Sequence, residues 1–234
     1  GSADVLEALG VRIDLSPQEA ADWLRDHRFA FLFAPNYHPA FRHIAPARRL
    51  CAERGQRTVF NFLGPLLNPA RPTVQLLGLP KPEWCEPIAR VLQSLGVRRA
   101  LVASGAVPSG PAGAAATAWL DELSPLGESR VAEYCHERGL SVGTLDPRMY
   151  PIQAARLEDL AGGDAVANAD CARRVLQGND RGPKRDAVLL NAGAALMVAE
   201  AAASVAEGWE VAARLIDSGA AAAKLEELQA ASRG

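Results

Sequence analysis

The apolar and polar positions of the first forty residues switch between helical and strand-like spacing. In residues 3–10 the apolar side chains fall on one side of a short helix that a glycine closes. A second helix is predicted from Ser16, which is its N-cap, with proline at the first helical position and Glu19 completing a capping box. The apolar run of residues 29–33 is strand-like, and residues 35–39, with a proline at each end, are predicted as a turn that cannot be helical.

A β-α-β pattern follows in the middle of the chain. Residues 74–78 and 99–103 are short apolar runs typical of buried strands, and residues 83–95 between them have the apolar spacing of a helix. This succession predicts parallel strands joined by a right-handed crossover. Residues 105–118, rich in glycine, alanine and proline, are predicted as a flexible loop after the second strand. The side chains expected to face inward on the crossover helix are Ile88, Val91, Leu92 and Leu95.

The rest of the chain is predicted as two further strands and then mainly helices. The strands are expected at residues 130–136 and 139–145. Helices are expected at residues 165–176, 185–203, 205–218 and 221–229. The second of these helices has a packing face of mainly small residues, formed by Val188, Leu189, Ala192, Ala195 and Leu196. We therefore predict an α/β fold, a mixed, mostly parallel sheet wrapped by helices.

Composition and charge exclude several classes of protein. The 234 residues carry 25 Lys and Arg against 27 Asp and Glu, so no overall field favours nucleic acid or an anionic membrane. No apolar run reaches the roughly 20 residues that a membrane span needs, and we expect a soluble, cytoplasmic protein. The four cysteines form no CxxC pair and are predicted to be reduced structural thiols.

Candidate chemistry gathers first between residues 29 and 69. Dense apolar sequence there surrounds His38, Arg48 and the turn Gly64-Pro65, which is how a pocket for a small anionic, aromatic molecule could be built. An arginine that projects from a helix into such a pocket binds a carboxylate through two parallel hydrogen bonds. Ordinary alternatives stay open for each residue: a solvated helix face for the arginine, a helix cap for the histidine and a plain turn for the Gly-Pro pair.

A second candidate is the acidic pair Asp121-Glu122. Adjacent carboxylates beyond a strand supply the oxygen ligands that Mg²⁺ prefers, and this metal is commonly shared with substrate phosphates. The carboxyl edge of an open α/β sheet is also where such folds bind ligands. An acidic pair of this kind is equally common on protein surfaces, so the pair alone is a weak signal.

Taken together, five segments in order resemble anthranilate phosphoribosyltransferase, from the first residue to about Leu228. The segments are FLFAPNYHPAFRHIAPARRL, RTVFNFLGPLLNP, LDELSP, LLNAGAAL and IDSGAA. The resemblance implies transfer of the phosphoribosyl group from phosphoribosyl pyrophosphate to the amine of anthranilate, with Mg²⁺, in tryptophan biosynthesis. It also implies a homodimer formed through a small helical subdomain.

The resemblance implies a role for each matching residue. Arg48 would grip the carboxylate of anthranilate, Ser2 would contact phosphoribosyl pyrophosphate, and Asp121 and Glu122 would hold magnesium on its pyrophosphate. Residues 1–30 and 72–234 are expected to form the α/β domain, and residues 31–71 to contribute to the helical subdomain and the acceptor pocket. The residues expected to line that pocket or its entry are Pro35, His38, Phe41, Gly64 and Pro65.

The sequence also departs from the family. The family's glycine-rich phosphate loop, its Asn-x-Ser-Thr segment and its Lys-His-Gly-Asn-Arg motif belong upstream of Gly1, so we expect the isolated chain to turn over slowly or not at all. Residues 106–118 are longer than the family's usual link, and Trp119 stands where a small residue is typical. Two rivals are a non-catalytic or nucleic-acid-binding paralogue of the same fold and a related nucleoside phosphorylase.

Overall fold

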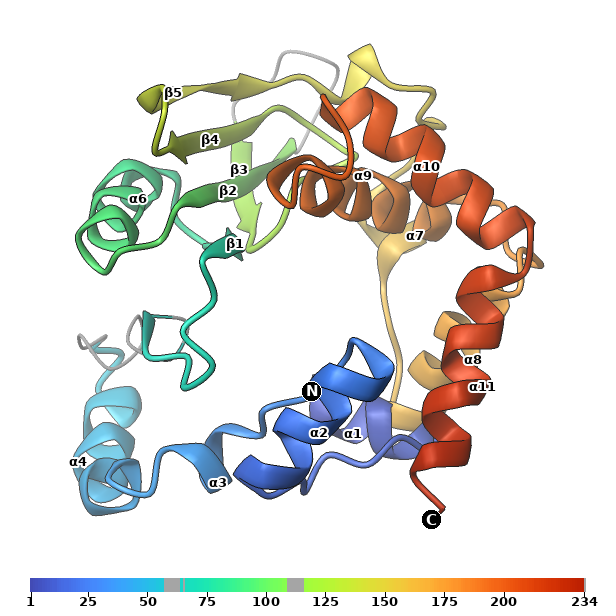
Figure 1. Ribbon diagram of the computed structural model, residues 1–234. Coiled ribbons are helices and arrows are strands. Elements are labelled where there is room, and N and C mark those ends of the chain that lie inside the picture. The colour runs from blue at the N-terminus through green and yellow to red at the C-terminus, as the bar shows by residue number, and fades with distance from the viewer. Residues whose placement is uncertain (57–63, 65, 109–115, 234) are drawn as a thin grey trace. The chain divides into compact units, whose positions relative to one another are not determined.

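A computed structural model describes residues 1–56, 64, 66–108 and 116–233. The chain forms two compact units, each with its own apolar core (Figure 1). These units are defined by contacts within the chain, and the functional domains expected above stay a prediction. The first unit comprises Gly1–Arg71, Gly163–Arg173 and Ala222–Gly234, and the second comprises Pro72–Gly162 and Arg174–Ala221.

The first unit is helical. Ser16 and Glu19 form the predicted capping box, since the Glu19 amide donates to Ser16 Oγ at 3.3 Å and the Ser16 amide donates to Glu19 Oε2 at 2.8 Å. Gly10 ends the first helix with a φ of +79°, a conformation that suits glycine. The unit contains α1 (Ser2–Ala8), α2 (Pro17–His27), α3 (Ala34–Tyr37) and α4 (Phe41–Glu53), with parts of α8 (Ala165–Leu176) and α11 (Ala220–Ala231).

Two local predictions in this unit are wrong. Residues 29–33 form no strand: they are irregular, and the rings of Phe31 and Phe33 stack with centroids 6.4 Å apart. Hydrophobicity there reflects packing of Phe29 and Leu32 against the core of the unit. The segment predicted as a non-helical turn contains α3, because Pro35 lies in the first helical turn, where its missing N–H needs no partner.

The second unit is built on a five-stranded mixed sheet, which confirms the predicted α/β class. Its order is β1-β2-β4-β5, with β3 paired to β2. Only β1 and β2 are parallel, and the other three pairings between described strands are antiparallel, so the parallel share is smaller than predicted. The strands are β1 (Val74–Gly78), β2 (Arg99–Pro108), β3 (Ala116–Leu120), β4 (Ser129–Cys135) and β5 (Gly139–Leu145).

The segment predicted as a flexible loop is partly a hairpin. Residues 105–108 continue β2 and residues 116–120 form β3, in a register that pairs Gly105 with Leu120. Small residues are typical of irregular structure, but here they occupy strand positions. Residues 109–115 lie outside the part of the chain that the structure describes.

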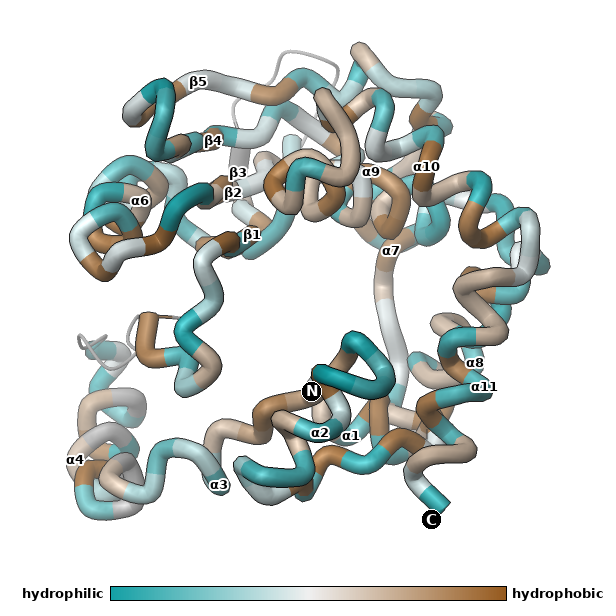
Figure 2. Tube along the Cα trace, in the orientation of Figure 1, coloured by the Kyte–Doolittle hydropathy of each residue, from teal (hydrophilic) through white to brown (hydrophobic). Residues whose placement is uncertain are grey.

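Helices cover both faces of the sheet (Figure 1). Leu101 and Ala103 of β2 pack with α9 (Pro183–Val198) and α10 (Val205–Asp217), while the alternate residues Ala100 and Val102 are buried beneath α6 (Cys85–Ser94). In Figure 2 α9 includes brown, apolar stretches, in keeping with its buried residues Leu189, Leu190 and Val198. Short helices complete the unit: η1 (Pro82–Trp84), η2 (Pro147–Met149) and α7 (Leu157–Leu160).

The inward faces of α6 and α9 differ in part from the predictions. Ile88 and Leu92 are buried as expected, but Val91 and Leu95 are 39% and 56% exposed. On α9, Leu189 is buried and Val188 is exposed, because the contact face runs through Leu190, Gly193 and Ala194 instead. Gly193 is needed there, since a Cβ on it would lie 2.7 Å from the Trp209 amide nitrogen of α10.

All four cysteines are free thiols, as predicted. Within the part of the chain that the structure describes, no helix is long and apolar enough to cross a membrane.

Candidate functional site

The acidic pair lies against the ends of the two parallel strands. Asp121 and Glu122 follow β3 directly, and Gly78 is the last residue of β1. A Cβ on Gly78 would lie 1.6 Å from the carbonyl oxygen of Asp121, and a Cβ on Gly105 would lie 2.5 Å from that of Glu122. The backbone of the pair therefore rests directly on two glycines, one from each strand.

Hydrogen bonds hold the residues that follow the pair. The Leu123 amide donates to Asn191 Oδ1 at 2.9 Å, and Asn191 Nδ2 donates to the Leu123 carbonyl at 3.0 Å. The Ser124 amide donates to Ser129 Oγ at 2.9 Å, and both serines are fully buried. The two carboxylates thus project from a backbone that is fixed on the side of the sheet and on the side of α9.

The electrostatics of the pair suit a divalent cation. Both residues are exposed, yet protein atoms crowd the Glu122 carboxyl enough to raise its pKa above the ordinary 4.5, and the charge of Asp121 raises it further. A bound cation would relieve this repulsion. Among the described residues no group of three or more His, Cys, Asp or Glu side chains forms a complete metal site. The pair fits Mg²⁺ that takes its other ligands from phosphates and water.

The predicted acceptor residues lie on α3, α4 and the turn between them. Pro35 is in α3 and is exposed. His38 caps that helix, with its amide donating to the Ala34 carbonyl at 2.9 Å. Phe41 begins α4, and Arg48 lies two turns further along the same helix. Phe41 and Arg48 thus share one helix, whereas the roles of these residues stay predictions.

Three further predicted residues belong to the first unit. Ser2 is exposed and begins α1. Gly64 is half-buried and helical, not part of the predicted turn, and its carbonyl accepts from the Leu67 amide at 3.3 Å. Pro65 lies outside the described residues. Asp121 and Glu122 are the predicted site residues of the second unit.

Sequence reasoning missed three residues that shape the acidic site: Gly78, Gly105 and Asn191. Asn191 belongs to the segment LLNAGAAL, which carried the resemblance without suggesting a role. The glycines end or continue strands, and only the close approach of the Asp121-Glu122 backbone shows why a side chain is excluded.

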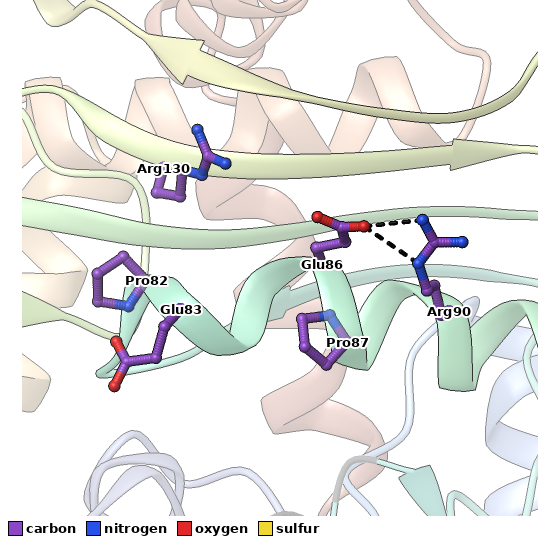
Figure 3. Close-up of a pocket in the computed structure, with 6 residues that line it drawn as sticks. All are labelled: Pro82, Glu83, Glu86, Pro87, Arg90 and Arg130. Carbon is purple, nitrogen blue, oxygen red and sulfur yellow. Dashed lines mark hydrogen bonds and ion pairs between the residues drawn. The ribbon is translucent and has the colours of Figure 1, made fainter.

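A cavity of about 530 Å³ elsewhere on the second unit contains none of the predicted residues. It is lined from η1, α6 and β4 (Figure 3). Glu86 and Arg90, one turn apart on α6, form an ion pair at 2.7 Å in which their charges neutralise each other. Its charges are mixed and none of its lining residues is a predicted site residue, so we assign it no role in the chemistry.

Residues 1–222 match the family described as "Glycosyl transferase family, a/b domain". The chain therefore belongs to this glycosyl transferase family, in agreement with its mixed sheet and helical layers.

Individual relatives within this glycosyl transferase family are more specific than the family itself. The chain is 48% identical, over 231 residues, to an anthranilate phosphoribosyltransferase of Thermomicrobium roseum, covering 98% of this chain and 62% of the relative. A crystal structure of anthranilate phosphoribosyltransferase from Thermus thermophilus is 43% identical with a TM-score of 0.85, covering 100% of this chain and 65% of that one. The Saccharomyces cerevisiae enzyme in complex with PRPP and Mg is 26% identical with a TM-score of 0.81, covering 100% of this chain and 63% of that one. The resemblance seen in the sequence is thus confirmed, and the chain spans less than two thirds of the length of these relatives.

Proposed function

We propose that the protein containing this chain transfers the phosphoribosyl group from phosphoribosyl pyrophosphate to the amine of anthranilate. The observation that carries the proposal is the 48% identity to an anthranilate phosphoribosyltransferase over 98% of the chain. The acidic pair at the strand ends supports it, because it is suited to a magnesium ion shared with a pyrophosphate. In this reaction the bond from the anomeric carbon to the pyrophosphate oxygen breaks, a carbon–nitrogen bond forms, and the amine loses a proton.

Asp121 and Glu122 serve the departing pyrophosphate. Cleavage of the bond at the ribose builds negative charge on that group and positive charge on the sugar. Bound Mg²⁺ would supply charge stabilisation for the leaving pyrophosphate. The part of the two carboxylates is to hold this ion in one place, and their fixed backbone limits how far they move as charge develops. Ser2 is assigned to a contact with phosphoribosyl pyrophosphate.

Arg48 serves the acceptor. Its guanidinium would bind the anthranilate carboxylate through two parallel hydrogen bonds, a planar match that lysine lacks. An aromatic amine is already neutral at pH 7, so no strong base is required and His38 is assigned to positioning. Placing the nitrogen in line with the anomeric carbon supplies much of the rate. The remaining pocket residues would be Pro35, Phe41, Gly64 and Pro65.

We further infer a cytoplasmic homodimer that forms through the helical subdomain. The resemblance to anthranilate phosphoribosyltransferase supports this inference. Sedimentation of the natural gene product at the mass of one chain would contradict the dimer.

The acceptor assignment is tested with two neighbouring arginines of α4. Steady-state kinetics of the natural gene product would compare Arg48→Ala with Arg49→Ala, which removes the same charge from the same helix. Arg49 is exposed and pairs with Glu53 at 3.2 Å, so its loss should leave the kinetics unchanged. Loss of a charge-assisted pair at Arg48 should raise KM for anthranilate by at least about tenfold and leave KM for phosphoribosyl pyrophosphate unchanged. Equal effects of the two substitutions would refute the role of Arg48.

A further inference from the structure

We propose that Asn191 of α9 is the positioning residue of the acidic pair, fixing the backbone from which Asp121 and Glu122 reach a divalent cation. The side chain of Asn191 bonds to backbone groups, and it acts through Leu123, the residue directly after the pair. The inference rests on the proposed function only in giving the cation a role in pyrophosphate departure.

The hydrogen bonds of Asn191 define a single orientation of its side-chain amide. Oδ1 accepts from the Leu123 amide at 2.9 Å, and Nδ2 donates to the Leu123 carbonyl at 3.0 Å. Nδ2 also donates to the Ala187 carbonyl at 3.0 Å, one turn earlier in α9. A flipped amide would lose all three bonds, since oxygen cannot donate to a carbonyl. Asn191 therefore forms hydrogen bonds with both the N–H and the C=O of Leu123, and a third hydrogen bond, to the Ala187 carbonyl, holds its side chain against α9.

The backbone groups of Leu123 have no access to water as an alternative hydrogen-bond partner. Leu123 is fully buried in the core between the sheet and α9. Its backbone N–H and C=O would lose their hydrogen bonds to Asn191 if that side chain were shortened, and buried polar groups are costly to leave unpaired. The segment would then shift to restore them. Because Leu123 is bonded directly to Glu122, a shift of Leu123 moves the backbone from which the carboxylates project.

Residues that orient metal ligands are known to affect affinity strongly. Removing an outer partner typically weakens metal binding by about 10 to 100-fold. Asn191 orients the ligands through the backbone and not through their carboxylates, so the lower end of this range applies. An asparagine is suited to the task because a single planar amide supplies both the acceptor and the donor that one peptide residue requires.

A matched control exists in the first unit. Asn168 clasps Gly163 in the same way: the Gly163 amide donates to Oδ1 at 2.8 Å, and Nδ2 donates to the Gly163 carbonyl at 2.9 Å. Asn168→Ala removes a similar pair of hydrogen bonds, made to an exposed residue of the other unit. Asn191→Leu keeps a similar volume but can neither accept nor donate a hydrogen bond, so it tests the role in a variant that leaves the space filled and adds no charge.

The experiment measures Mn²⁺ binding by water-proton relaxation, with and without inorganic pyrophosphate, on the chain and its variants, after circular dichroism has shown each to be folded. We expect Asn191→Ala and Asn191→Leu to weaken Mn²⁺ binding about tenfold, and Asn168→Ala to leave it unchanged. In the natural gene product the same variants should raise KM for phosphoribosyl pyrophosphate and leave KM for anthranilate unchanged.

The outcomes separate this inference from the proposed function. Wild-type affinity for Mn²⁺ in folded Asn191 variants would overturn the positioning role, as would the absence of Mn²⁺ binding by the wild-type chain. Weakened Mn²⁺ binding without any transfer of phosphoribosyl groups in the wild-type gene product would uphold the positioning role and refute the function.

Discussion

Gly78→Ala should disable the acidic site while leaving the strand that carries it formed. The added Cβ would lie 1.6 Å from the carbonyl oxygen of Asp121 and 2.3 Å from its carbonyl carbon. Both atoms belong to the backbone, so no side chain can rotate away to make room. The Asp121-Glu122 peptide must move by about 1.4 Å to reach the 3.0 Å separation below which Cβ contacts are essentially not observed.

The size of the effect follows from this displacement. A misplacement of about 1 Å in a catalytic group costs on the order of 100-fold in rate. Overpacking of this kind also costs about 1–3 kcal/mol of stability. We therefore expect a fall of about 100-fold in kcat/KM for phosphoribosyl pyrophosphate, together with a lower unfolding temperature.

The assay and its control use the same substitution at two strand positions. Gly143 lies in β5, and a Cβ there would meet no atom within 4 Å. Gly143→Ala should leave both activity and Mn²⁺ binding unchanged. Steady-state kinetics on the natural gene product and Mn²⁺ relaxation on the chain would report the comparison. Activity of Gly78→Ala equal to that of Gly143→Ala would refute the reasoning.

Three other predictions concern packing and ionisation. Gly193→Ala places a Cβ 2.7 Å from a backbone nitrogen of α10, so thermal unfolding should show a net loss of about 1–2 kcal/mol despite the better helix propensity of alanine; an unchanged or higher unfolding temperature would contradict this. The raised pKa of Glu122 means that the folded chain binds the carboxyl proton more tightly than the unfolded chain does. The ionised carboxylate therefore lowers the free energy of unfolding at pH values above the raised pKa. This destabilisation disappears below the ordinary pKa of 4.5, where the carboxyl is protonated in both states. Glu122→Gln should accordingly stabilise the metal-free chain at neutral pH and not in acid, and a stabilisation that persists in acid would point to another cause. Burial raises the pKa of Cys85 to about 11, so iodoacetamide at neutral pH should label half-buried Cys51 and Cys171 but not Cys85 until the chain unfolds, as mapped by mass spectrometry.

Elements with strong local signals were predictable from the sequence. The capping box at Ser16 and the glycine stop at Gly10 depend on residues close together in the chain, and both are present. The parallel pairing of β1 with β2 followed from the helix between them, because a crossover of that length favours parallel strands.

Features that depend on distant contacts were not predictable in the same way. Residues 29–33 have strand-like apolar sequence but pack as an irregular segment, since burial and not strand pairing accounts for their hydrophobicity. The hairpin of β2 and β3 was hidden by small residues, which locally favour a loop. Val91 and Leu95 fit a helical apolar face but lie outside the contact with the sheet.

The acidic pair could be found from the sequence, but its setting could not. Asp121-Glu122 stands out as two adjacent carboxylates after a strand. Gly78 is 43 positions before Asp121, and Asn191 is 68 positions after Leu123. Only the fold therefore shows that Gly78 and Asn191 contact the same backbone segment, residues 121–123. The raised pKa of Glu122 likewise comes from crowding by protein atoms, which a linear pattern does not reveal.

The central claim is tested most directly by following the fluorescence of anthranilate in the presence of the natural gene product. The account predicts that anthranilate is consumed only when phosphoribosyl pyrophosphate and Mg²⁺ are both present, with release of pyrophosphate in equal amount. Anthranilate that remains unconsumed with both present, or that is consumed at the same rate without phosphoribosyl pyrophosphate, would contradict it.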